Sequence, residues 1–351
     1  MTGPSPELEA RVLAEVRTGN ARIAHDYDAL HYEEAPEPLL DPKNVLNVGR
    51  TYGCHASAGD ILDLGCGAGV QLSRAGREAS GRLVGVDLGV ENCRRAVERC
   101  REFGDRAQIL NADLLDVKAE QLGTFDVIYA VGTVYVVPPE VRARVFEVIA
   151  NCLRPGGVAL ISYYSGTLPA MRAYVHGLLR NGIAPTSNPL EAVARARQLL
   201  QTLAQGVDPR HPSLMLHGMQ QTASLPDATF YHEVFNPFFT PLHTSELQRV
   251  LGASGIDFCV VSMDTRLGKS PRRTKGRWRP MRKNCRRAVT ITMRSVARAV
   301  RADKRLPVNR EPNQDIAWFF SDKARPAEMP WIILHRNMKR VSVTDGCSNN
   351  P

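Results

Sequence analysis

The sequence of 351 residues is long enough for one large domain or two ordinary ones with a well-buried core. With 43% hydrophobic and 23% charged residues, it is neither a disordered nor a fibrous chain. Its longest apolar runs fall short of the ~20 residues that a membrane span needs, and the first residues lack the pattern of a secretory signal. We therefore expect a cytoplasmic protein with no integral membrane segment.

The formal charge of +9 is concentrated in one segment. Residues 266–310 hold 17 lysines and arginines against one acidic residue, a net charge of +16, which leaves −7 for the rest of the chain. This segment needs an explanation of its own. The eight cysteines form no C-x-x-C pair, and no cysteine or histidine cluster has zinc-finger spacing, so we expect free thiols and no metal site.

After an N-terminal arm (1–59), apolar runs of strand length alternate with helical patterns, which is typical of βα units on a parallel sheet. Helices are expected at 91–103 and 139–153. Five strands are expected at 60–64, 82–87, 108–110, 125–130 and 158–163. These units form a core domain over residues 60–165.

The pattern changes after residue 165. Residues 166–242 are predicted to be an added helical piece, a lid, with helices at 169–180 and 189–203. The sheet resumes at 243–264, with a helix at 244–253 that Thr244 or Ser245 caps and a sixth strand at 257–263. A seventh strand at 330–336 opens the last segment, 330–351. Between strands six and seven lies the basic insertion, 265–329.

A glycine-rich loop follows the first strand, where glycines let the backbone approach a ligand closely. It does not match the dinucleotide pattern G-x-G-x-x-G, because the third glycine comes one residue early, at Gly69, and position 70 is Val70. Asp63, just before the glycines, also argues against a pyrophosphate. A carboxylate there suits the amino group and sulfonium of a methionine derivative, directly or through water.

Two further carboxylates come at the ends of the next strands. Asp87 closes the second strand, where a carboxylate can accept hydrogen bonds from both hydroxyls of a ribose. Asp113 follows the third strand and is placed to accept from an adenine amino group. Each signal is weak alone, but their order and spacing together predict an adenosyl-sulfonium pocket.

These motifs resemble those of class I S-adenosylmethionine-dependent methyltransferases over residues 60–165, and again over about 243–337. The resemblance rests on Asp63-Leu-Gly65-Cys-Gly67-Ala-Gly69, Gly85-Val-Asp87, Ala112-Asp113, Phe125-Asp-Val-Ile128 and Leu153-Arg-Pro-Gly-Gly157. It implies an α/β, Rossmann-like, seven-stranded methyltransferase sheet that binds S-adenosylmethionine. The cofactor-binding residues that it implies are Asp63, Gly65, Cys66, Gly67 and Gly69 beside the methionine part, Asp87 and Leu88 at the ribose, Ala112, Asp113 and Leu114 at the adenine, and Ala130.

A narrower resemblance starts in the N-terminal arm. The segments 27–36, 132–142 and 162–164 are similar to those of bacterial methyltransferases that carry a methyltransferase regulatory domain, some of which are protein lysine methyltransferases. This chain differs from them in being shorter after residue 205, in having Tyr164 where Asn is usual, and in its basic insertion.

Methyl transfer is an in-line displacement, so the protein mainly has to hold an unprotonated nucleophile and exclude water. The segment after strand four reads Ala-Val-Gly-Thr rather than Asn-Pro-Pro-Tyr, which disfavours DNA bases and glutamine amides. Tyr135, Tyr164 and His31 are the predicted catalytic residues, and His232 is a further proton-acceptor candidate. The aromatic side chains at these strand ends and in the arm could form a lid over the substrate, or simply pack the arm onto the sheet; they are Tyr27, Tyr32, Tyr135, Tyr163 and Tyr164.

Within the basic insertion, residues 284–305 have the pattern of an amphipathic helix with an arginine face. Its apolar positions are Val289, Met293, Val296 and Val300, and its arginines are Arg287, Arg294, Arg298, Arg301 and Arg305. Such a face either docks an acidic peptide, a phosphorylated carrier or nucleic acid, or is a solvated helix surface. The connection between strands six and seven places it at the rim of the site.

The preferred interpretation is a methyltransferase acting on a nucleophile, preferably nitrogen, of a protein or peptide side chain. A small-molecule N- or O-methyltransferase is the alternative within enzymes. A non-catalytic S-adenosylmethionine-binding module that docks an acidic partner through its arginine face is the alternative of another class. A homodimer is compatible with any of these.

Overall fold

The structure, a computed structural model, describes most of the chain up to residue 261 and one strand near its end. The described residues are 5–33, 40–51, 54–163, 167–184, 186–206, 219–220, 222–242, 244–253, 256–261 and 331–336. The predicted basic insertion (265–329), its amphipathic helix (284–305) and Tyr164 lie outside the described residues.

One sheet organises the fold, with strand order β3-β2-β1-β4-β5-β7-β6. Strands β1 to β5 run parallel, whereas β7 pairs antiparallel with both β5 and β6. The strands are β1 (Ile61–Leu64), β2 (Leu83–Asp87), β3 (Ala107–Asn111), β4 (Phe125–Ala130), β5 (Leu153–Ser162), β6 (Ile256–Val261) and β7 (Trp331–Arg336). The prediction of five parallel strands in a Rossmann-like α/β fold is therefore confirmed.

Strand β5 differs from its predicted bounds. It begins at Leu153 rather than at residue 158, because Leu153 already pairs with Phe125 of β4. The register then shifts, so that the next pair is Val127 with Val158, and Gly156 has a φ of 81° within the irregularity. Gly156 and Gly157 therefore form part of a bulge inside the strand.

The two faces of the sheet are buried under different helices. Alternating side chains of β1 divide between them: Leu62 and Leu64 belong to one apolar cluster and Ile61 to the other. Helices α6 (Pro139–Cys152) and α11 (Thr244–Ala253) contribute to the first cluster, and α2 (Pro42–Thr51) and α3 (Val70–Gly76) to the second. With both faces covered, the ligand-binding edge is left at the carboxyl ends of the parallel strands.

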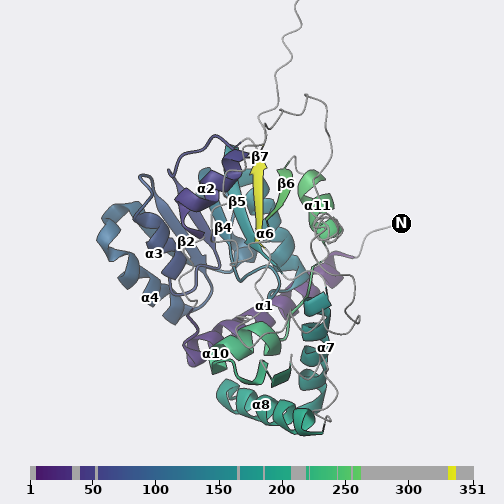
Figure 1. Ribbon diagram of the computed structural model, residues 1–351. Helices are drawn as coiled ribbons and strands as arrows, with labels where there is room; N and C mark the ends of the chain where they lie inside the picture. Colours follow the sequence, from purple (N-terminus) through teal and green to yellow (C-terminus); the bar gives the residue numbers. More distant parts are fainter. Residues whose placement is uncertain are drawn as a thin grey trace, which may run out of the picture.

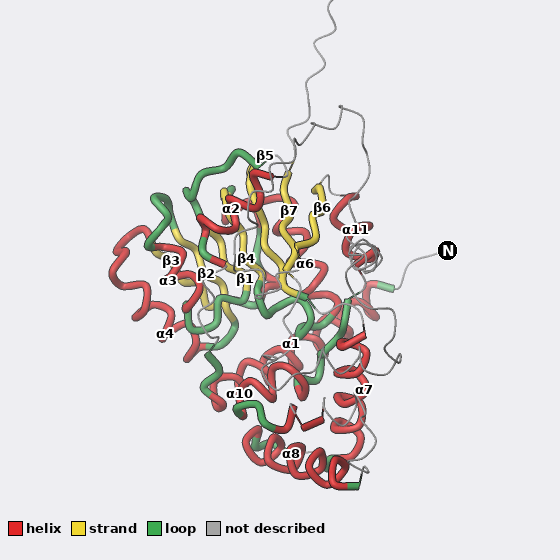
Figure 2. The backbone as a smooth tube through the Cα atoms, in the orientation of Figure 1, coloured by secondary structure: helices red, strands yellow, loops and turns green. Residues whose placement is uncertain are grey.

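Helix α1 (Pro6–Leu30) lies between the sheet and a group of helices beyond its carboxyl edge (Figures 1 and 2). That group contains α7 (Thr167–Gly182), α8 (Pro189–Gln205), α10 (Asp227–Phe230) and a π-helix, η4 (Tyr231–Phe235). Leu30 of α1 shares an apolar cluster with Leu179, Val193 and Phe230 from these helices. The two helices predicted at 169–180 and 189–203 are present as α7 and α8, and their role as a lid remains a prediction.

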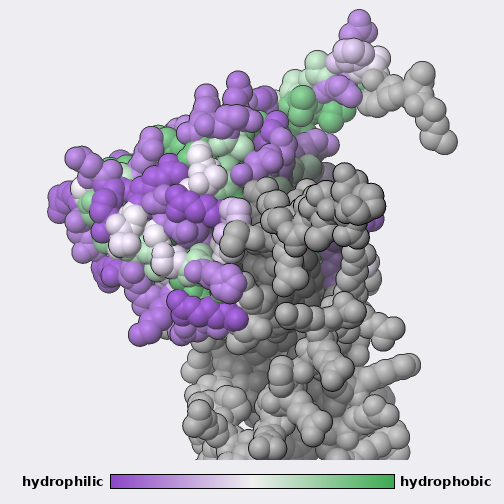
Figure 3. All heavy atoms as spheres, turned by 90° about the horizontal axis from the view of Figure 1, so that it is seen from above, coloured by the Kyte–Doolittle hydropathy of each residue, from purple (hydrophilic) through white to green (hydrophobic). Residues whose placement is uncertain are grey.

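The outer surface is mixed in character. Figure 3 shows that hydrophilic side chains cover most of the described part of one face, with hydrophobic side chains scattered among them. Within the described ranges, no helix has both the length and the apolar character that crossing a bilayer requires.

Asp28 of α1 caps a helix of the sheet layer from outside. Its carboxylate accepts hydrogen bonds from the backbone N–H groups of Glu91 (3.3 Å) and Asn92 (3.2 Å), in the first turn of α4 (Val90–Cys100). The residue at the N-cap position of α4, Gly89, has no side chain to do this. The contact therefore joins the N-terminal arm to the core.

We expect Asp28→Ala to lower the free energy of unfolding by about 1 kcal/mol, the usual cost of losing a helix cap. Urea denaturation followed by circular dichroism measures this. The exposed Asp105, replaced by alanine, is the matched control and should change stability by less than ~0.5 kcal/mol. Equal stabilities for the two variants would show that Asp28 does not secure α4.

Candidate functional site

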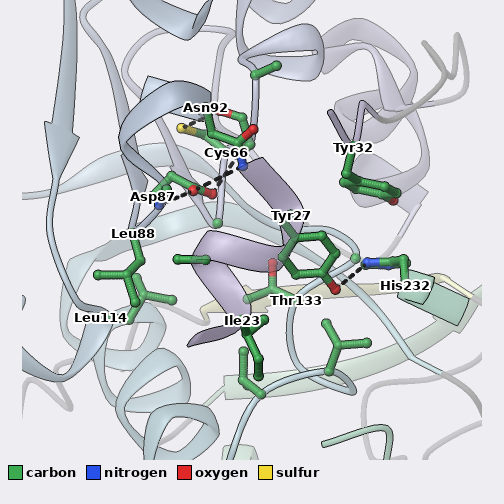
Figure 4. Close-up of a pocket in the computed structure, with 18 of the residues that line it drawn as sticks. Ile23, Tyr27, Tyr32, Cys66, Asp87, Leu88, Asn92, Leu114, Thr133 and His232 are labelled. Atoms are coloured by element: carbon green, nitrogen blue, oxygen red, sulfur yellow. Dashed lines mark hydrogen bonds between the residues drawn. The ribbon is translucent and has the colours of Figure 1, made fainter. Parts of the chain in front are cut away.

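A cavity lies where the carboxyl ends of β1, β2 and β4 meet α1 and η4 (Figure 4). The sheet layer contributes the loop after β1, the end of β2, the segment after β3 and the loop after β4. Helix α1 contributes one helical face, and η4 contributes His232. Seven predicted cofactor-binding residues line the cavity: Gly65, Cys66, Gly67, Asp87, Leu88, Asp113 and Leu114.

The three loop glycines all have positive φ, at 80° for Gly65, 51° for Gly67 and 73° for Gly69, but they serve different purposes. A Cβ atom on Gly65 would lie 2.5 Å from Thr133 Oγ1, and one on Gly69 would lie 2.9 Å from Ala96 Cα. These two glycines allow the loop to pack against the protein. A Cβ atom on Gly67 would meet nothing within 4 Å, and Gly67 lines the cavity. The space above Gly67 is therefore free for a ligand, which fits a cofactor lying across this loop.

Asp87 is fixed by the backbone around it. Its carboxylate accepts hydrogen bonds from the N–H groups of Gly67 and Gly89, both at 2.9 Å, and one at 3.4 Å from the Asn92 side chain. Burial raises the pKa of Asp87, and these donors oppose that shift. The position of the carboxylate in the cavity wall suits the recognition of a diol.

Asp113 joins the segment after β3 to helix α1. Its Oδ1 atom caps the short helix η3 (Leu114–Asp116) by accepting from Leu115 N at 2.9 Å, and Asn20 Nδ2 lies 3.3 Å from Oδ2. Arg17, one turn earlier on α1, pairs with Asp116 through two contacts of 2.6 and 2.7 Å. Helix α1 is therefore secured over this side of the cavity.

Asp63 lies beneath the glycine loop and not in the cavity wall. It is 3% exposed, and its burial together with the charge of Asp87 raises its pKa to about 7. A buried acid with this environment keeps its proton more readily than the unfolded chain does.

The raised pKa of Asp63 predicts a pH dependence of stability. The folded protein retains this proton up to about pH 7, whereas the unfolded chain loses it near pH 3.9, so stability falls as the pH rises between these values. Asp63→Asn removes this loss. The stability difference between variant and wild type should therefore grow by up to about 4 kcal/mol from pH 4 to pH 8, at 1.36 kcal/mol per pKa unit.

Urea titrations at several pH values measure the effect of Asp63→Asn. The matched control is Asp105→Asn, an exposed position whose difference from wild type should stay nearly constant. A flat difference for Asp63→Asn as well would show that its carboxyl is ordinary in the folded protein.

Aromatic residues form the side of the cavity opposite Asp87, Leu88 and Leu114 (Figure 4). Tyr32 stacks on His232, with ring centroids 4.6 Å apart and an interplanar angle of 14°. The Tyr27 hydroxyl lies 2.9 Å from His232 Nδ1, and the Tyr135 hydroxyl lies 2.9 Å from His232 Nε2. Burial lowers the pKa of His232, so its imidazole is neutral near pH 7.

The other predicted site residues lie away from the cavity wall. Asp63, Gly69, Ala112 and Ala130 do not line the cavity. Tyr135 is fully buried behind His232. His31 is exposed at the end of α1, where it has a φ of 49°. The described structure therefore places His232, and not His31, at the cavity.

The prediction from sequence missed one helical face. Asn20, Ile23 and Ala24 line the cavity together with Tyr27, at positions i, i+3, i+4 and i+7 of α1. This spacing is visible in the sequence and could have identified the face. Thr133 and Val136, in the loop after β4, also line the cavity; they lie in the segment 132–142 that the sequence resemblance singled out, but no spacing marks them individually.

Residues 61–157 match the family model described as a methyltransferase domain. Among curated proteins, the chain is 31% identical to the uncharacterized protein RP028 of Rickettsia prowazekii (strain Madrid E) over 152 residues, 40% of this chain and 59% of that one. It is 28% identical to the ubiquinone biosynthesis O-methyltransferase of Bordetella pertussis over 154 residues, 42% and 60% of the two chains. The chain thus spans about three fifths of the length of these relatives.

Among solved structures, the fold is similar to that of PKMT2 from Rickettsia typhi in complex with AdoHcy, with a TM-score of 0.55 and 19% identity. The match covers 65% of this chain and 45% of that chain. Residues 61–157 therefore match a methyltransferase domain in sequence, and the chain has a Rossmann-like methyltransferase fold. The sequence resemblance to this class is therefore confirmed.

Proposed function

We propose that the protein is an enzyme that transfers the methyl group of S-adenosylmethionine to a nitrogen of a protein or peptide side chain. The observation that carries this proposal is the two-sided cavity. Gly67 and Asp87 form a backbone and carboxylate cradle on one side, and Tyr27 and His232 form a hydrogen-bonding aromatic wall on the other. When bound, the cofactor supplies an activated methyl group on a sulfonium.

The residues of the cradle would hold the cofactor. Asp87 is placed to accept hydrogen bonds from ribose hydroxyls, and Gly67 leaves room for the ligand to contact the backbone. Asp113 and Leu114 line the cavity where an adenine would lie beside α1. Helix α1 and the aromatic wall exclude water from the acceptor, which favours a desolvated nucleophile.

Two observations support a protein acceptor. The arm and strand-end motifs resemble those of methyltransferases with a regulatory domain, some of which modify protein lysines. The fold likeness to PKMT2 extends over 65% of this chain, well beyond the 97 residues of the methyltransferase domain match. A nitrogen acceptor that enters as a neutral amine needs no strong base in the site.

A small-molecule O- or N-methyltransferase is the second candidate, and the 28% identity to a ubiquinone biosynthesis O-methyltransferase favours it. A non-catalytic module that binds the cofactor and docks an acidic or phosphorylated partner through residues 284–305 is a proposal of another class. If residues 284–305 instead dock the acceptor of an active enzyme, the Michaelis constant for that acceptor should rise steeply with ionic strength. A flat salt response would exclude such docking.

The experiment uses cell extract incubated with the protein and S-adenosylmethionine that carries an isotopically labelled methyl group. Mass spectrometry then compares wild type, Asp87→Asn and a control variant at the exposed Glu98, Glu98→Gln. The proposal predicts label on protein side chains with wild type and Glu98→Gln, and none above background with Asp87→Asn. Label confined to small molecules would favour the second candidate, and no label despite cofactor binding would favour the docking module.

A further inference from the structure

A continuous hydrogen-bond chain runs through the aromatic wall. Asn236 Nδ2 donates to the Tyr27 hydroxyl at 3.0 Å, the Tyr27 hydroxyl lies 2.9 Å from His232 Nδ1, and His232 Nε2 lies 2.9 Å from the Tyr135 hydroxyl. These residues come from three separate parts of the chain: α1, the loop after β4, and η4 with the residue that follows it. Tyr27 and His232 line the cavity, whereas Tyr135 and Asn236 are fully buried behind them.

Asn236 fixes which groups donate and which accept along these hydrogen bonds. Its Oδ1 atom accepts the backbone N–H of Phe238 at 2.8 Å, so its amide nitrogen must face Tyr27. The Tyr27 oxygen therefore accepts one hydrogen bond from Asn236. If its own proton goes to His232 Nδ1, the imidazole carries its proton on Nε2 and donates to Tyr135. Tyr27 is then left with one lone pair free to face the cavity.

The neighbouring charged groups do not compete for His232. Glu233 pairs with Arg172, and Asp26 accepts the hydroxyl proton of Tyr231 at 2.6 Å. Asp87 is held by the backbone on the opposite side of the cavity. Both ring nitrogens of His232 lie within hydrogen-bond distance of neutral hydroxyls. A neutral imidazole can therefore accept one of these hydrogen bonds and donate the other.

The aromatic wall lies on one side of the point in the sheet where ligands of this fold bind. In a doubly wound sheet, the ligand crosses the point where strand order reverses, here between β1 and β4. Asp87 ends β2 and Leu114 comes shortly after β3, on the β1 side of that point. Thr133 follows β4, and Tyr27 and His232 lie on that side of the cavity in Figure 4. The aromatic wall therefore faces the end where an acceptor would enter.

We infer that the Tyr27 hydroxyl oxygen accepts the N–H of the acceptor amine and that His232 is the positioning residue that holds Tyr27 in this role. This inference rests on the proposed function. The nitrogen lone pair forms a bond to the methyl carbon while the carbon–sulfur bond breaks and its electrons stay on sulfur. The extra proton remains on the methylated nitrogen, hydrogen-bonded to Tyr27, and is lost to water after release. No proton has to reside on His232.

The test compares two ligands that differ at the methyl-bearing position. S-adenosylhomocysteine has a sulfur there, and sinefungin has a carbon whose amino group takes the place of the transferred methyl. The N–H groups of that amine extend to where the acceptor nitrogen would approach. Calorimetry gives the ratio of their dissociation constants. We expect Tyr27→Phe to reduce the relative affinity for sinefungin about 10-fold, the usual effect of one hydrogen bond of this kind, and His232→Phe to reduce it in the same direction. Tyr231→Phe, which also removes a buried hydroxyl contact, is the matched control and should leave the ratio unchanged.

A second readout is the tautomer of His232 in spectra of protein labelled with nitrogen-15 at histidine. The inference predicts the proton on Nε2 in wild type. An unchanged ligand ratio in Tyr27→Phe, or a proton on Nδ1, would overturn the inference while leaving the proposed function intact. Failure of wild type to bind S-adenosylhomocysteine would instead overturn the proposed function.

Discussion

Replacing Asp87 with asparagine should weaken the binding of S-adenosylhomocysteine by about 100-fold. The Asp87 carboxylate accepts the backbone N–H groups of Gly67 and Gly89 on its two oxygens, both at 2.9 Å. An amide has one oxygen, so its NH₂ group must oppose one of these donors. The variant loses a charge-assisted hydrogen bond within the loop and another to the ribose, each worth about 1.5–3 kcal/mol. The bond within the loop is also lost without ligand, so part of this free energy lowers stability and not affinity.

Calorimetric titration with S-adenosylhomocysteine measures the effect of Asp87→Asn, and thermal denaturation without ligand shows how much of it comes from the loop. Glu98→Gln is the control, since Glu98 is exposed and makes only a surface ion pair with Arg101. A change of less than threefold in affinity for Asp87→Asn would contradict the assignment of this carboxylate to the ribose.

A methyl group added at Gly67 should abolish detectable cofactor binding while the protein still folds. The added Cβ would meet no protein atom within 4 Å, but Gly67 lines the cavity, so the methyl group would compete for the space that we propose for the cofactor. The backbone cost of Gly67→Ala at a φ of 51° is about 1–2 kcal/mol, which a stable domain tolerates. The loss of binding therefore exceeds the loss of stability.

Gly104 provides the matched control for Gly67. It also has a positive φ, of 56°, and a Cβ there would likewise meet nothing within 4 Å, but Gly104 does not line the cavity. Gly104→Ala should lower the melting temperature and leave cofactor affinity unchanged. If both variants bind the cofactor as wild type does, the ligand does not lie over the glycine loop.

Much of the parallel part of the sheet could be predicted because β1, β2 and β4 are short and almost fully buried apolar runs that each end at a turn. All four residues of β1 and the first four of β2 are buried, as a sheet covered on both faces requires. The bounds of β5 could not be predicted, because Pro155 and the two following glycines indicate a turn locally. The pairing of Leu153 with Phe125 depends on a strand far away in the sequence.

The side of the cavity that holds Gly67 and Asp87 was more predictable than the aromatic side. Gly67 and Asp87 belong to a continuous strand and loop pattern, so local spacing brings them together. His232 meets Tyr27 and Tyr135 only because α1 and η4 pack beyond the sheet. Among many aromatic and histidine residues, the sequence favoured His31, which is exposed, since no local pattern marks which histidine reaches the cavity.

The central claim is that this cavity binds the S-adenosyl cofactor, as the sulfonium or as its thioether product, through a glycine cradle and a strand-end carboxylate. Titration of the wild-type protein with S-adenosylhomocysteine, and separately with NAD, in the same calorimeter tests it most directly. We predict saturable binding of S-adenosylhomocysteine at one site per chain and no measurable heat with NAD at the same concentrations. Saturable binding of NAD, or no binding of S-adenosylhomocysteine by a folded protein, would contradict the claim.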